Sequence, residues 1–92
     1  MLLAIDVGNT NTVLGMFDGE VLSSSWRIKT DAHTTADEMA LTFRGLLAGK
    51  SPITGIALCS TVPAVLREMR LMLDRYFADV PTVIVEPGTR TG

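Results

Sequence analysis

Two stretches of this sequence place their apolar residues on one helical face, and a short apolar run lies between them. The helical stretches cover residues 36–47 and 63–78, and the run covers residues 53–60. A capping box, Thr35 to Glu38, opens the first helix, and Pro63 fits the first turn of the second. The short run is typical of a strand buried on both faces. This alternation predicts a layered α/β fold with right-handed crossovers.

The part of the chain before the first helix is rich in strand and turn signals. Strands are predicted over 2–7, 12–17 and 20–29, and a final short strand over 82–86. Asp18-Gly19 is typical of a type I′ hairpin turn, in which both central residues have positive φ. The predicted order is βββαβαβ. Sequential hairpins and right-handed winding predict a mixed five-stranded sheet of order 3-2-1-4-5, with the first strand at the centre.

Length and composition limit the classes of protein. With 92 residues, of which 47% are hydrophobic and 20% charged, the chain fits one globular domain. The formal net charge of −2 argues against nucleic acid and anionic membranes as partners. No apolar run is long enough to span a bilayer, and the single cysteine, Cys59, suits a reducing compartment. We therefore expect a cytoplasmic protein.

The turn after the first strand has residues suited to a nucleotide phosphate. Gly8 lets phosphate oxygens approach the backbone, and successive amides in such a turn can form an anion-binding nest. Asn9 and Thr10 add side-chain donors. Asp6 would hold a Mg²⁺ ion that bridges the phosphate oxygens. The same residue types dominate ordinary hairpin turns, so a plain turn is the alternative.

Other candidate residues have structural explanations. Residues 45–51 look like a P-loop but have one residue too few between the glycines and follow a helix, so we reject that interpretation. His33 lies in a polar loop and is expected in solvent, whereas Cys59 is expected in the core. Trp26 is expected to pack on its strand. Met69 and Met72 are expected in the core. A solvated helix face is expected to carry four charged residues: Arg67, Arg70, Asp74 and Arg75.

Several segments, in order along the chain, resemble the first lobe of type III pantothenate kinases. They are Asp6-Val7-Gly8-Asn9-Thr10-Asn11-Thr12, Trp26-Arg27-Ile28 with Thr30-Asp31, Thr35-Ala36-Asp37-Glu38, Ser60-Thr61-Val62-Pro63 and Pro87-Gly88-Thr89-Arg90-Thr91-Gly92. The first motif alone is shared among actin-like kinases. The ordered set, which covers the whole chain, is more specific.

The resemblance implies a ribonuclease H-like, actin-like ATPase lobe over residues 1–92. It implies ATP-dependent phosphorylation of pantothenate to 4′-phosphopantothenate, the first step of coenzyme A synthesis. ATP, Mg²⁺ and a monovalent cation, K⁺ or NH₄⁺, would be the cofactors, and the complete protein would be a homodimer. The implied nucleotide-binding residues are Asp6, Val7, Gly8, Asn9, Thr10, Asn11 and Thr12, with Asp6 as the metal residue.

The resemblance also implies what residues 1–92 lack. The aspartate expected to act as general base follows Gly92 in the family, as does the second lobe that holds adenosine. Phosphoryl transfer needs groups on both sides of the nucleotide, so residues 1–92 alone are expected to be inactive and to bind ATP weakly. Two alternatives stay open. One is a transcriptional accessory protein, since proteins resembling this family have been described in that role; the other is another actin-like sugar kinase or phosphohydrolase, since the phosphate motif is shared.

Overall fold

The computed structural model describes residues 1–85, and the strands and helices follow the predicted order βββαβαβ. The bounds are β1 (Leu2–Val7), β2 (Asn11–Asp18), β3 (Val21–Lys29), α1 (Ala36–Leu47), β4 (Gly55–Ser60), α2 (Pro63–Tyr76) and β5 (Thr82–Val85). Helix α2 therefore ends two residues before the predicted end. The predicted loop at 87–92 lies outside the described residues.

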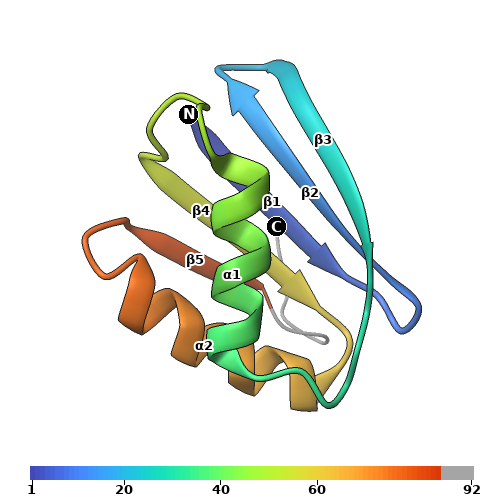
Figure 1. The fold of residues 1–92 in the computed structure, drawn as a ribbon. Helices are drawn as coiled ribbons and strands as arrows, with labels where there is room; N and C mark the ends of the chain where they lie inside the picture. Colours follow the sequence, from blue (N-terminus) through green and yellow to red (C-terminus); the bar gives the residue numbers. More distant parts are fainter. Residues whose placement is uncertain (86–92) are drawn as a thin grey trace.

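The five strands form one mixed sheet with the predicted order 3-2-1-4-5, so β1 is central (Figure 1). Strand β2 runs antiparallel to both β1 and β3, because short turns join these three strands. Strand β1 pairs in parallel with β4, and β4 with β5, because α1 connects β4 to β3, which runs in the same direction as β1, and α2 connects β4 to β5. The carboxyl ends of β1, β4 and β5 therefore lie at the same edge of the sheet.

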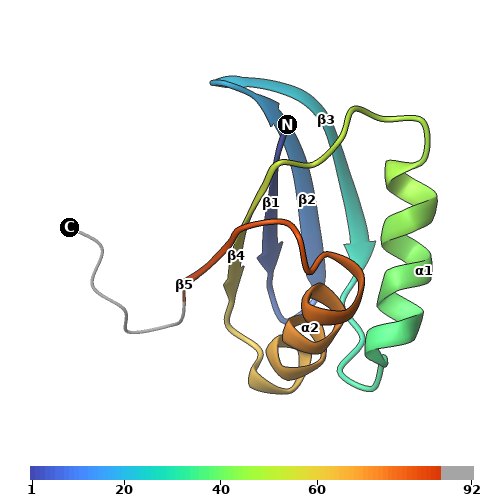
Figure 2. The same ribbon diagram turned by 90° about the vertical axis from the view of Figure 1, so that its left-hand side faces the viewer.

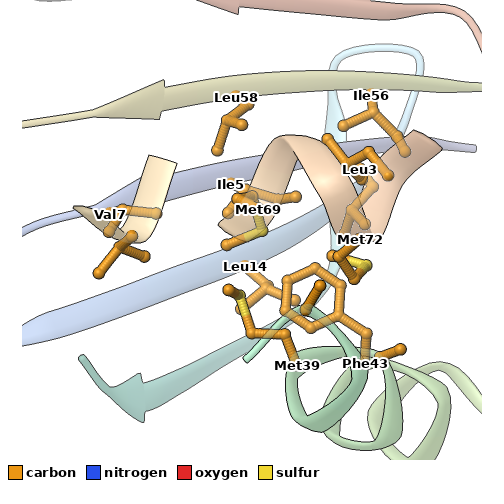
Figure 3. Packing of buried hydrophobic residues seen from close by; sticks show 14 of the residues in the cluster. Leu3, Ile5, Val7, Leu14, Met39, Phe43, Ile56, Leu58, Met69 and Met72 are labelled. Carbon is orange, nitrogen blue, oxygen red and sulfur yellow. The ribbon is translucent and has the colours of Figure 1, made fainter. Parts of the chain in front are cut away.

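Both helices pack on one face of this sheet, and the core lies between the two layers (Figure 2). Alternate residues of the strands point toward the helices, as the two-residue period of a strand requires. In β1 these are Leu3, Ile5 and Val7, each at most 2% exposed. Figure 3 shows them beside side chains from β2, from β4 and from both helices, among them Leu14, Met39, Phe43, Ile56, Leu58, Met69 and Met72. The prediction that Met69 and Met72 lie in the core is confirmed.

No element of residues 1–85 covers the other face of the sheet (Figure 2). Strand β4 is therefore buried on one face only, and the prediction that it is buried on both is wrong. Ile56 and Leu58 face the helices, but Cys59 points to the open face and is exposed. The prediction that Cys59 lies in the core is wrong for the same reason. An apolar run has the same appearance in sequence whether one or two layers cover it.

The helices begin as the sequence predicts. In α1, the Thr35 hydroxyl accepts a hydrogen bond from the Glu38 amide, and the Glu38 carboxylate accepts one from the Thr35 amide. This capping box satisfies amides that have no partner within the helix. Helix α2 starts with Pro63, and its Glu68 carboxylate accepts from the Ala36 amide at 3.1 Å. The second helix thus helps to hold the start of the first.

The hairpin between β2 and β3 differs from the predicted type I′ turn. Asp18 pairs with Val21, so the two central residues are Gly19 and Glu20 rather than Asp18 and Gly19. Gly19 has φ of 61°, and no residue other than glycine has positive φ in the described chain. Positive φ at the first central position alone is the type II′ pattern, which also requires glycine there.

The remaining structural predictions concern features outside the turn after β1. The P-loop-like segment lies at the end of α1 and leads into β4, so it cannot present a phosphate to a following helix. His33 is exposed, as predicted, and so are the four charged residues of α2 that were expected on its solvated face: Arg67, Arg70, Asp74 and Arg75. Trp26 is half-buried against the core, with the Lys50 ammonium 5.9 Å from its ring centroid. Within residues 1–85, no helix has the length and apolar character needed to cross a membrane.

Candidate functional site

The turn from β1 to β2 lies at the edge where the carboxyl ends of the parallel strands meet. Val7, the last residue of β1, pairs with Ser60 of β4 on one side and Thr12 of β2 on the other. The end of β3 reaches the same edge, because Lys29 pairs with Asn11. In open α/β sheets, ligands bind outside the carboxyl ends of the strands where the connections diverge. Here β1 connects to β2 on one side and pairs with β4 on the other.

A backbone hydrogen bond closes this turn. The Gly8 amide donates to the Asn11 carbonyl at 2.9 Å, so it holds the turn together and is not free to bind a ligand. A Cβ at position 8 would lie 3.2 Å from that same carbonyl oxygen, which explains why glycine fits here. In the part of the chain that the structure describes, the amides of Asn9 and Thr10 donate no hydrogen bond. Two successive donors are therefore available to an anion.

The seven predicted nucleotide-binding residues fall into two groups. Four of them lie at or beside the turn and are exposed: Asp6, Asn9, Thr10 and Asn11. Gly8 is half-buried. Val7 and Thr12 are buried, with exposed fractions of 0% and 3%, and their side chains face the helices. In this conformation, the side chains of Val7 and Thr12 pack between the sheet and the helices, where they support the turn and do not contact solvent.

Asp6 lies on the open face of the sheet, beside the turn. It lines one end of a groove of about 370 Å³ whose other residues are mostly apolar, including Ala4, Gly15 and Ala57. Its neighbours across the sheet are Val13 and Cys59. Asp6 is therefore the acidic group of a largely apolar surface.

The fit of Asp6 to a metal ion depends on which ion is considered. Among residues 1–85, no group of three or more His, Cys, Asp or Glu side chains gathers to hold a metal. A metal held entirely by protein side chains does not fit this arrangement. Mg²⁺ commonly binds through one or two carboxylates together with substrate phosphates and water. An exposed carboxylate beside two free amides fits that mode.

Two threonines that flank the turn were not predicted as site residues. Thr30, just after β3, donates its amide to the Thr10 carbonyl at 2.9 Å. Thr61, just after β4, donates its amide to the Val7 carbonyl at 3.1 Å. Each extends its strand's pairing by one residue, so the turn is held from both sides. The predicted sheet order already placed the residues after both strands at this edge, and that was the available signal.

The start of α2 adds a further feature to this edge. The Ser60 hydroxyl is buried and accepts from the Val62 amide at 3.1 Å. Val62 is the N-cap of α2 and provides no side-chain hydrogen bond to the first turn of the helix. The amide groups at the start of a helix favour negative charge. The start of α2 thus lies at the same edge of the sheet as the two free amides of the turn.

The sequence as a whole matches one family model. The model for type III pantothenate kinase matches residues 2–92. This chain belongs to the type III pantothenate kinase family. Membership accounts for the ordered set of motifs, of which the turn at 6–12 is the first, and it confirms the family inferred from them.

Curated relatives with the same family name align with the whole chain. The type III pantothenate kinases of Frankia alni and Salinispora arenicola are each 67% identical to it, and that of Streptomyces avermitilis is 56% identical. All of this chain is covered in each comparison, but only 36%, 37% and 38% of the respective relatives. The chain thus spans little more than a third of the length of these type III pantothenate kinases.

Solved structures confirm the ribonuclease H-like, actin-like fold of this type III pantothenate kinase segment. A Listeria monocytogenes protein proposed to be an N-acetylmannosamine kinase superposes with a TM-score of 0.63 and 18% identity. The superposition covers 92% of this chain and 34% of the Listeria monocytogenes chain. RuvC of Thermus thermophilus superposes with a TM-score of 0.56 and 21% identity, covering 94% of this chain and 61% of its own. At these identities the likeness concerns the fold alone.

Proposed function

We propose that the complete protein containing residues 1–92 transfers the γ-phosphoryl group of ATP to pantothenate. The product would be 4′-phosphopantothenate, and the reaction the first step of coenzyme A synthesis. The observation that carries this proposal is the family match over residues 2–92, together with 67% identity to curated type III pantothenate kinases. The turn at the edge of the sheet supports it independently, because its free amides suit a phosphate.

Each part of the turn has a proposed role in holding ATP. The amides of Asn9 and Thr10 would donate to phosphate oxygens, and the exposed side chains of Asn9, Thr10 and Asn11 would add further donors. The buried residues Val7 and Thr12 would keep the turn in place. Preorganised donors of this kind stabilise charge without having to reorganise during the reaction.

Asp6 is the proposed metal residue. Its carboxylate would hold Mg²⁺ either directly or through water, on the side of the turn that faces the groove. When bound, Mg²⁺ would neutralise charge on the phosphate oxygens. A monovalent cation, K⁺ or NH₄⁺, is part of the proposal on the family resemblance alone.

The remaining catalytic parts are proposed to lie outside residues 1–92. They are the general-base aspartate and the second lobe, which would close the cleft over adenosine. We also propose that the complete protein is a cytoplasmic homodimer. Residues 1–92 by themselves present one wall of the cleft, so they would bind ATP weakly and not turn it over.

Two alternatives have less support. A transcriptional accessory role would require contact with nucleic acid, and a net charge of −2 offers no electrostatic attraction to a phosphate backbone. A sugar kinase or phosphohydrolase would use the same turn, but the structural likeness to a proposed sugar kinase has only 18% identity. The ordered family match favours pantothenate over both.

A coupled assay of ADP formation by the complete gene product tests the proposed substrate. ADP release should depend on pantothenate, and 4′-phosphopantothenate should accumulate in equal amount. ADP release at the same rate without pantothenate would indicate a hydrolase. Release only with an added sugar would indicate the sugar-kinase alternative.

A further inference from the structure

Thr30 makes two hydrogen bonds to the chain that leaves the turn. Its amide donates to the Thr10 carbonyl at 2.9 Å, and its hydroxyl lies 2.9 Å from the Thr12 hydroxyl. Thr10 is one of the two residues whose amides are free. Thr30 thus contacts the turn at a carbonyl and supports it at a buried side chain two residues later.

The two hydrogen bonds differ in what they require of residue 30. The hydrogen bond from the residue 30 amide to the Thr10 carbonyl depends only on the backbone, so any residue except proline can form it. The second bond requires a hydroxyl at position 30. Thr12 is 3% exposed on the face of the sheet that the helices cover, in the same strand as the fully buried Leu14. A buried hydroxyl that loses its partner is unfavourable, so it tends to rotate or to admit water.

Residue 12 is close to the free amides. It is the second residue of β2, and the turn that precedes it is closed by a single bond from the Gly8 amide to the Asn11 carbonyl. A shift at Thr12 would therefore pass directly into Asn11 and the turn. The hydroxyl pair joins the end of β3 to the start of β2 at this point.

We propose that Thr30 is a positioning residue for the phosphate-binding turn. Its hydroxyl fixes Thr12, and Thr12 in turn fixes the amides of Asn9 and Thr10 where a triphosphate binds. Thr30 itself touches no ligand. This inference rests on the proposed function, because it assumes that the turn binds the phosphates of ATP.

The test compares KM for ATP with KM for pantothenate in the complete gene product. Thr30→Val keeps the shape and the amide but removes the hydroxyl. It should raise KM for ATP by about five- to tenfold, the effect of one lost hydrogen bond, and change KM for pantothenate by less than about twofold. Thr30→Ser, which restores a hydroxyl, should return KM for ATP toward the wild-type value. Thr42→Val, on an exposed position of α1, is the matched control.

A double-mutant cycle separates positioning from independent effects. If the two hydroxyls act as a unit, the double variant Thr12→Val with Thr30→Val should raise KM for ATP no more than the larger of the two single effects. Increases that multiply in the double variant would overturn the proposal. If Thr30→Val does not fold, the double variant replaces it, because it leaves no buried hydroxyl without a partner. The double variant should then raise KM for ATP no more than Thr12→Val does.

A purely structural role has a different result. In that case Thr30→Val would lower the thermal midpoint but leave both KM values unchanged, or raise both equally, and the proposal would be wrong. Failure of the proposed function is recognised in the wild-type protein. If wild-type binds ATP by calorimetry but does not use pantothenate, the substrate is wrong and Thr30 is tested by ATP affinity instead. If wild-type binds no ATP, both proposals are wrong.

Discussion

At the scale of single residues, Gly8 shows most clearly how the turn depends on its sequence. Its amide closes the turn, and the Asn11 carbonyl lies so close that a Cβ would be 3.2 Å from the oxygen. Few Cβ atoms approach a neighbour so closely, and here the neighbour is backbone, which yields less easily than a flexible side chain. Gly8 is thus required for close approach rather than for an unusual φ.

Gly8→Ala should therefore weaken ATP binding more than it weakens the fold. The added methyl group would push the Asn11 carbonyl away and displace the amides of Asn9 and Thr10. We expect KM for ATP to rise about tenfold or more, as for the loss of one to two hydrogen bonds. Gly45→Ala is a suitable control, because a Cβ at this exposed helix position meets nothing within 4 Å. Equal KM values for the two variants would contradict this account of the turn.

At the scale of elements, side chains near opposite ends of α1 and α2 hold the two helices together. The Tyr76 hydroxyl, at the end of α2, donates to the Asp37 carboxylate in the first turn of α1 at 2.7 Å. Arg75 lies 3.4 Å from the same carboxylate, and the Arg44 guanidinium lies 4.8 Å from the Tyr76 ring centroid. The hydrogen bond to Asp37 raises the pKa of Tyr76 above its ordinary value of 10.0, and partial burial and the Asp37 charge act in the same direction.

This raised pKa predicts how the contact responds to pH. Because the folded protein holds the Tyr76 proton more tightly than the unfolded chain, the contact stabilises the fold below the ordinary pKa. That contribution is lost as the pH rises through the raised value. Tyrosinate absorbance, measured as the difference from Tyr76→Phe, should show a midpoint above 10, and Asp37→Asn should lower it. An unchanged midpoint in Asp37→Asn would show that the hydrogen bond is not its cause.

The positions of the helices and strands could be predicted from the sequence better than the burial and contacts of their side chains. The helical spacing, the capping box at Thr35 and the strand order were predicted, because each follows from local pattern or from chain winding. The exposure of Cys59 was not, because an apolar run does not reveal how many layers cover it. The role of Thr30 also could not be predicted, because its contact with Thr12 depends on the register between β2 and β3. The predicted position of the hairpin turn at Gly19 was wrong by one residue for the same reason.

At the scale of the whole molecule, the uncovered face of the sheet is its most unusual feature. All-parallel sheets are found almost only with both faces covered; in this mixed sheet one face is open and exposes large apolar side chains. Leu2, Leu22 and Val83 are 41%, 51% and 65% exposed. The curated relatives are much longer than this chain, which spans 36–38% of their length. We expect additional chain in the complete protein to cover this face.

The reactivity of Cys59 can test whether this face is covered in the complete protein, since Cys59 is exposed on the open face here. In the complete gene product it should react with iodoacetamide at least about tenfold more slowly than after denaturation in urea, because buried thiols are inaccessible. Peptide mass spectrometry identifies the modified residue. Ser51→Cys, placed in an exposed loop, is the control and should react at a similar rate before and after denaturation. Rapid modification of Cys59 in the native protein would contradict the expected cover.

The central claim is that the turn after β1 binds a triphosphate with Asp6 directing the metal, and one comparison tests it most directly. The kcat/KM for MgATP of the complete gene product is measured for Asp6→Asn and for Asp18→Asn, an exposed aspartate at the opposite edge of the sheet. Loss of a metal-holding carboxylate removes several kcal/mol of transition-state stabilisation, so Asp6→Asn should lower kcat/KM on the order of 100-fold or more. Asp18→Asn should stay within about twofold of wild-type, because surface substitutions far from a site have small effects. Equal values for the two variants would contradict the claim.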